Sequence, residues 1–93
     1  MPKRIQRKRV KGWRAPPGAV YVGRGSKWGN PFTIERYGRE GAVNMFQNYI
    51  GHPNSQLGFE PWDIEELRGK NLMDWCSLDE TCHGDVLLRI ANA

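Results

Sequence analysis

The segment at residues 75–85 holds both cysteines of the chain and one of its two histidines. It reads WCSLDETCHGD and leads into an apolar run with helical spacing. A thiol at a helix N-terminus beside an imidazole has a lowered pKa and can act as a nucleophile. We therefore take Cys82, His83 and Asp85 as the candidate catalytic residues of an enzyme.

Two other interpretations of this segment stay open. The first is a zinc site: Cys76, Cys82 and His83 supply three soft metal ligands, but His52 or Asp85 would have to be a distant fourth. A structural zinc site usually has four ligands at paired short spacings, so we expect no metal and no cofactor. Asp85 could instead cap the helix, while His83 bonds a backbone carbonyl and the cysteines fill the core.

A second stretch, VYVGRGSKWGNPF, runs from an apolar strand-like segment into a loop of glycines and basic side chains. Glycines let backbone N–H groups turn toward an anion, and arginine and lysine bind phosphate. The spacing is not that of a Walker loop. The alternative is a structural turn with the tryptophan in the core. The candidate ligand-binding residues in this loop are Arg24, Ser26, Lys27, Trp28 and Asn30.

The charge is distributed unevenly along the chain. The net charge is +4, but residues 1–34 carry +9 without a single acidic side chain, and the remaining residues carry −5. A basic tract of this kind indicates a polyanionic partner, or else a solvated arm that folds back on the acidic body. Residues 1–14 read as an extended arm. Its candidate nucleic-acid-binding residues are Arg4, Arg7, Lys8, Arg9, Lys11 and Arg14.

The periodicity of apolar residues and the turn signals predict alternating strands and helices. In chain order these are a strand at 19–23, a loop at 23–31, a second strand or an extended edge segment at 32–36, a helix at 39–50, a polar loop at 53–61, a short helix from 63, a strand at 71–76 and a helix from 81 or 83 to about 91. A crossover of this length makes the two main strands parallel.

This order predicts a small α/β domain with a short, mostly parallel sheet flanked by helices. The 93 residues form a single domain, with the basic arm at 1–14 and a globular body at 15–93. Parallel strands end on the same edge of a sheet, where ligands of open α/β sheets bind. We therefore expect the loops 23–31 and 76–85 to face each other and to form one site.

Length and hydropathy exclude several classes of protein. No apolar run approaches the ~20 residues that span a bilayer, and no apolar region follows the basic start as in a signal peptide. We expect no membrane contact and a location in the cytoplasm, the interior of a host cell. Cys76 and Cys82 are then free thiols rather than a disulfide. Homo-oligomerisation stays open, since a second subunit would stabilise so small a core.

The chain resembles a known family of domains of unknown function that is common in bacteriophage and actinobacterial genomes. The resemblance rests on RIQRKRVKGW, VYVGRGSKWGNPF, LRGKNLMDWC and CHGDVLL, and it covers residues 4–92. The family's marks are Trp28-Gly29-Asn30 and Cys82-His83. The resemblance implies a phage origin and a basic arm that belongs to the domain, but no activity.

Three functions are compatible with these patterns. The leading hypothesis is a module that binds a phosphorylated ligand, either a nucleotide or a nucleic acid, between the loops 23–31 and 76–85. The second is a small enzyme acting on a nucleotide or nucleoside through Cys82, His83 and Asp85. The third is a phage effector that binds a host protein.

Overall fold

Three short parallel strands form the sheet of the computed structural model, which describes residues 2–53 and 57–93. They are β1 (Arg4–Gln6), β2 (Val20–Tyr21) and β3 (Leu72–Asp74), in the spatial order β1-β3-β2. Arg4 and Val20 both lie opposite Leu72 in the register. The predicted small α/β fold with a parallel sheet is confirmed. Met1 and residues 54–56, part of the predicted polar loop, lie outside the described residues.

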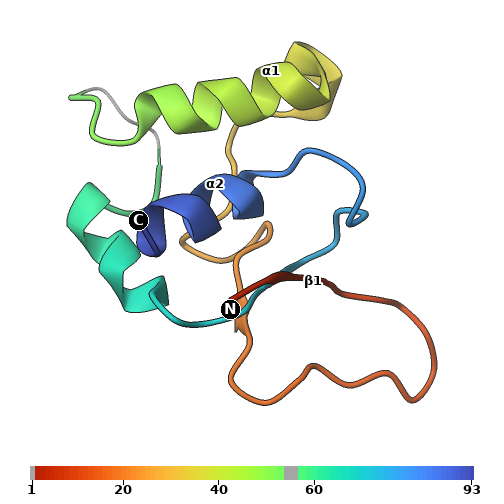
Figure 1. Ribbon diagram of the computed structural model, residues 1–93. Coiled ribbons are helices and arrows are strands. Elements are labelled where there is room, and N and C mark those ends of the chain that lie inside the picture. Colours follow the sequence, from red (N-terminus) through yellow and green to blue (C-terminus); the bar gives the residue numbers. More distant parts are fainter. Residues whose placement is uncertain (1, 54–56) are drawn as a thin grey trace.

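Two α-helices and one 3₁₀ helix pack against this sheet. They are α1 (Ile34–Tyr49), η1 (Pro61–Leu67) and α2 (His83–Ala91). α2 lies between α1 and the strands and contacts β1, β3 and η1 as well (Figure 1). The connection from β2 to β3 passes through α1 and η1, which is the predicted crossover between parallel strands.

The start of α1 differs from the prediction of an extended segment at 32–36. The Thr33 hydroxyl accepts a hydrogen bond from the Arg36 N–H at 3.3 Å, and this N-cap starts a helical turn at Ile34. Gly38 then leaves the helical conformation at φ +72°, which favours glycine, and the helix resumes to Tyr49. The helix predicted at 39–50 is therefore confirmed, and the extended segment is wrong because a cap was overlooked.

The basic segment is only partly an arm. Residues 4–6 form the edge strand β1, which pairs with β3 along its whole length. The Arg7 N–H continues this pairing to the Asp74 carbonyl at 2.6 Å. Residues 7–19 then run as an irregular loop around the lower side of the molecule in Figure 1. The body thus begins at residue 4 rather than 15.

The core lies where α1, α2 and η1 meet the sheet. Its fully buried apolar side chains come from every layer: Val22, Phe46, Leu67, Leu72 and Leu87. Since the strands are two or three residues long, the helices supply most of the apolar surface that stabilises the fold. No helix in the described part of the chain is long and apolar enough to cross a membrane.

Candidate functional site

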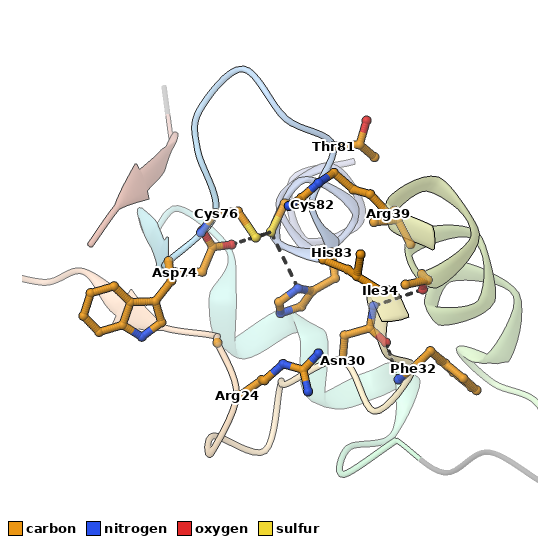
Figure 2. A pocket seen from close by; sticks show the side chains of 14 residues that line it. Arg24, Asn30, Phe32, Ile34, Arg39, Asp74, Cys76, Thr81, Cys82 and His83 are labelled. Atoms are coloured by element: carbon orange, nitrogen blue, oxygen red, sulfur yellow. Dashed lines mark hydrogen bonds between the residues drawn. The ribbon is translucent and has the colours of Figure 1, made fainter. Parts of the chain in front are cut away.

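A cavity of about 140 Å³ lies at the carboxyl edge of the sheet, between the two loops. The first loop contributes Gly23, Arg24 and Asn30, the second contributes residues around Cys76, Cys82 and His83, and α1 forms the apolar wall. Figure 2 shows side chains from all three elements directed into one space. The predicted meeting of the two loops is confirmed.

Four chemically reactive groups lie at the floor of this cavity. The Cys82 thiol, 1% exposed, lies 2.7 Å from Asp74 Oδ2 and 2.9 Å from Cys76 Sγ. His83 Nδ1 lies 3.6 Å from the same sulfur. The single proton of the Cys82 thiol therefore lies between two acceptors, a carboxylate and a second sulfur. The two sulfurs are not covalently joined.

The two cysteines differ in acidity, in the opposite sense to the sequence-based hypothesis. The hydrogen bond from Cys82 lowers the pKa of Cys76 to about 7, and Arg39 favours the same thiolate. That hydrogen bond, burial and the contact with Asp74 all raise the pKa of Cys82. The expectation that the helix N-terminus lowers the pKa of Cys82 is wrong, because the hydrogen bond to Cys76, burial and the Asp74 carboxylate all favour the protonated thiol.

The tautomer of His83 follows from its backbone contact. Its Nε2 lies 2.7 Å from the Val22 carbonyl oxygen. A carbonyl can only accept, so Nε2 carries the proton and Nδ1 presents a lone pair to Cys82. Burial lowers the pKa of His83, which favours this neutral form. His83 thus bonds a backbone carbonyl, as one of the alternatives predicted, and still lines the cavity.

Asp85, the third predicted catalytic residue, points elsewhere. It is exposed and accepts a hydrogen bond from Arg4 Nε at 3.0 Å. It is absent from the cavity lining. The sequence placed it near His83, but helical neighbours do not face each other, and the carboxylate instead joins the network around Arg4.

Arg4 is enclosed by the second loop rather than available to nucleic acid. Its guanidinium pairs with the buried Asp74 carboxylate at 3.2 Å and is 8% exposed. It also donates to three backbone carbonyls of the loop, those of Cys76, Ser77 and Glu80. The prediction that Arg4 contacts nucleic acid is therefore wrong. The Arg4 side chain is paired with a buried carboxylate, and the distribution of charge along the sequence does not reveal this contact.

Most polar groups of the first loop are used within the fold. The Ser26 hydroxyl and N–H both bond the Gly23 carbonyl, and the Gly29 N–H bonds the Ser26 carbonyl. The Ser26 and Gly29 N–H groups therefore close turns instead of facing an anion. Trp28 packs against Phe59 at a centroid distance of 4.9 Å and is 5% exposed, which is the core position of the alternative interpretation.

The two cations of this loop have different surroundings. Lys27 Nζ pairs with Glu66 at 3.1 Å and lies over the Trp28 ring, away from the cavity. The Arg24 side chain lines the cavity and has no hydrogen bond or ion pair with any described residue. Arg24 is therefore the loop's one cation presented to the cavity.

Asn30 lines the cavity but is mainly a structural residue. Its Oδ1 accepts from the Phe32 N–H at 2.9 Å, and its Nδ2 donates to the Ala42 carbonyl at 3.0 Å. These bonds hold the loop to α1 (Figure 2). Asn30 thus shapes the wall of the cavity.

Two side chains that line the cavity were not predicted from the sequence. Arg39, from α1, lines the cavity opposite Arg24, with its Nε 2.9 Å from Glu80. Asp74 ends β3 and lies at the floor. An acid at the carboxyl end of a predicted strand was a usable signal for Asp74. Arg39 carried no signal, since it lies in a helix with charged neighbours.

The remaining basic residues form an exposed loop beside the cavity. Lys8, Arg9, Lys11 and Arg14 are exposed. The guanidinium groups of Arg7 and Arg9 lie over the Trp75 ring at 4.8 and 4.5 Å. Trp75 lines the cavity as well, so the basic loop and the cavity share a border.

Comparison with known families identifies the domain. The family described as "Domain of unknown function (DUF4326)" matches residues 5–93. The chain belongs to this family. The expected membership of a family of uncharacterised domains is confirmed, and the phage or actinobacterial origin stays a prediction. The match includes β1, so the basic segment is part of the DUF4326 domain.

One viral relative of this DUF4326 domain is "Uncharacterized protein R718" of Acanthamoeba polyphaga mimivirus. It is 34% identical over 86 residues, which cover 85% of this chain and 57% of the relative. The chain therefore spans little more than half the length of that protein. No solved structure matches the chain significantly.

Proposed function

We propose that this DUF4326 domain binds a small phosphorylated ligand, a nucleotide or a fragment of one, in the cavity between its two loops. The observation that carries the proposal is the Arg24 guanidinium, which lines the cavity without a partner among the described residues. A guanidinium forms charge-assisted, bidentate bonds with phosphate oxygens.

The rest of the cavity suits the remainder of such a ligand. Arg39 supplies a second cation, and Phe32, Ile34 and Val43 supply an apolar wall. At about 140 Å³ the cavity has room for one ring-sized group, below the size of typical pockets for larger ligands. A nucleobase or sugar on the apolar wall, with its phosphate between the two arginines, uses all of these features.

The test is a binding titration with the four ribonucleoside 5′-monophosphates at low and high salt. A ligand at a hundred times its Kd stabilises the fold by about 2.7 kcal/mol, which raises the Tm of a domain of this size by about 10 °C or more. We expect one monophosphate to give this shift and to keep it at high salt, because a formed pocket is less screened than a surface patch.

Matched variants locate the site. Arg24→Ala should weaken binding by about 10–100-fold, the loss of one charge-assisted interaction. Lys27→Ala removes a cation from the same loop that does not line the cavity, so its affinity should equal that of the wild type. Equal losses in both variants would mean that only the surface charge of the loop matters, and the pocket would be excluded.

Nucleic acid is the second candidate, favoured by the four exposed cations of residues 8–14 beside Trp75. It predicts a shift only with DNA or RNA oligonucleotides, lost as salt rises because bound counterions are released. Lys8→Ala with Lys11→Ala should then reduce affinity, while Arg24→Ala should not. This result would overturn the proposed nucleotide pocket and favour a surface that binds nucleic acid.

A further inference from the structure

We propose that Asp74, Cys76, Cys82 and His83 bind one Zn²⁺ ion at the floor of the cavity. This metal site does not rest on the nucleotide binding proposed above. The sequence offered Cys76, Cys82 and His83 but no fourth ligand nearby. The structure supplies Asp74, while both earlier candidates for that position, His52 and Asp85, are outside the cluster.

Three of the four side chains already converge. The ligand atoms of Asp74, Cys82 and His83 all lie within 4.8 Å of one another, and all three residues are buried. Zinc–sulfur and zinc–nitrogen bonds of about 2.3 and 2.0 Å at tetrahedral angles place the two ligand atoms about 3.5 Å apart. The separation of Cys82 Sγ and His83 Nδ1 is 3.6 Å.

Cys76 completes the set from the side of the cavity. Its sulfur lies 2.9 Å from Cys82 Sγ, and its side chain is half-buried at the wall of the cavity. The contacts of Cys82 with Cys76 and with Asp74, at 2.9 and 2.7 Å, must each open by about 0.8–0.9 Å to reach tetrahedral separations. The thiol proton of Cys82 bridges these atoms, and zinc binding would release that proton together with any proton on Cys76, so that both sulfurs coordinate as thiolates.

The groups around the cluster orient the ligands as in metal sites. Metal-binding histidines usually donate their other ring N–H to a carbonyl or carboxylate, and His83 Nε2 donates to the Val22 carbonyl. Asp74 Oδ1 accepts from Arg4 and from the Cys76 N–H, both at 3.2 Å, which leaves Oδ2 for the ion. Both ligands are thus fixed in the orientation that coordination requires.

The charges also balance. Two thiolates and one carboxylate around a divalent ion leave one net negative charge, which is offset by the buried Arg4 guanidinium, 3.2 Å from Asp74 and shared with the exposed Asp85. Two sulfur ligands with one imidazole and one carboxylate favour zinc over magnesium or calcium, which prefer oxygen. Four protein ligands make a closed, structural site that ties the second loop to β3 and to the start of α2.

The experiment uses the full chain, reduced and stripped of metal with a chelator, and titrates it with cobalt(II) chloride. Tetrahedral thiolate coordination gives a sulfur-to-cobalt charge-transfer band and strong visible bands. We expect one cobalt ion per chain, displaced by zinc chloride, and a higher Tm in zinc than in chelator because the unfolded chain lacks the site.

Variants separate ligands from neighbours. Cys76→Ser and Asp74→Asn should each abolish the tetrahedral cobalt spectrum or weaken metal binding by more than about 100-fold. Changes to residues that only orient the ligands cost about 10–100-fold. Asp79→Asn removes an exposed carboxylate of the same loop and should bind as the wild type does. If Asp74→Asn does not fold, Cys76→Ser decides, since that position is only half-buried.

Three results would overturn the zinc site. The first is a folded, reduced chain without a charge-transfer band at saturating cobalt. The second is a spectrum that Cys76→Ser leaves unchanged. The third is a chain isolated with a Cys76–Cys82 disulfide whose reduced form takes up no metal, which would make the pair a redox pair instead.

Discussion

The two loops that line the cavity use their polar groups in opposite ways. In the first loop, the Ser26 and Asn30 side chains and the Ser26 and Gly29 N–H groups bond within the loop or to α1, and Arg24 is the cation that lines the cavity. In the second loop, the reactive side chains converge on Asp74, and a buried arginine holds the backbone around them. The first loop is a scaffold with one cation that lines the cavity, and the second is a cluster of reactive side chains.

This difference shows what separates a site from a polar sequence. Glycine, serine and asparagine are equally suited to binding an anion and to closing a turn, and here they close turns. Beside the second loop, the buried Asp74 carboxylate is paired with Arg4 and the Cys76 N–H through Oδ1 and still presents Oδ2 to the Cys82 thiol. Convergence of buried polar groups is therefore the better guide to function in this fold.

The strongest test of the comparison is Arg4→Ala, which removes the anchor of the second loop. We expect it to cost about 3–5 kcal/mol for the broken buried pair and more for the loop carbonyls left without a donor. Urea denaturation of the reduced protein measures this, with the exposed Lys11→Ala as a control that stays within about 0.5 kcal/mol. A loss below about 1 kcal/mol for Arg4→Ala would contradict the anchoring role.

The matching test for the first loop is Trp28→Ala. Trp28 is 5% exposed and packs on Phe59, so its truncation should cost about 3–4 kcal/mol, as for other buried aromatics. Trp62, 72% exposed, gives the control, and Trp62→Ala should change the free energy of unfolding by less than about 0.5 kcal/mol. Similar losses in the two variants would mean that Trp28 is not an anchor.

A smaller effect is expected at Gly84, where α2 meets the cluster. Alanine usually stabilises a helix by about 1 kcal/mol over glycine. Here a Cβ would lie 2.7 Å from Asp74 Oδ2, so Gly84→Ala should destabilise the fold by about 1–3 kcal/mol instead. Thermal unfolding measures whether the Tm of Gly84→Ala rises or falls. The exposed Arg89→Ala on the same helix serves as the control. Stabilisation would show that the helix and β3 are not in close contact.

Alkylation of the two thiols is the smallest perturbation, and it distinguishes Cys76 from Cys82 without a change in the sequence. In metal-free, reduced protein, iodoacetamide should modify Cys76, which lines the cavity with a pKa of about 7. The rate should fall as the pH drops below about 7, because the thiolate is lost. Cys82, 1% exposed with a raised pKa, should react only after unfolding. Peptide mass analysis reports both sites, and equal rates in the folded state would refute the difference.

Local patterns were sufficient for much of the fold. The apolar stripe of residues 39–50, the strand around Val20 and the run before Ala91 all formed as expected, since periodicity reflects the face that a helix or strand buries. The crossover length implied parallel strands, and hence the meeting of the two loops. The first turn of α1 was missed because one Thr33 cap outweighed the extended preference of its neighbours.

The cavity residues were predictable only in part. Arg24, Asn30, Cys82 and His83 were named from the loop sequences and do line the cavity. Asp85, Ser26 and Lys27 were named from proximity along the chain and point elsewhere. Side-chain direction depends on which partner is closer in space, and sequence spacing does not give that distance.

Residue patterns predicted β2, β3, the helices, the parallel crossover and the two loops that meet at its edge, but not the edge strand β1. These follow from local apolar periods and connection lengths. The folded structure was needed to show that Arg4 is buried against Asp74, that Cys76 rather than Cys82 is the more acidic thiol, and that Arg39 lines the cavity. Each of those depends on an interaction between residues far apart in the chain, and the charge or acidity of a group is set by its neighbours in space.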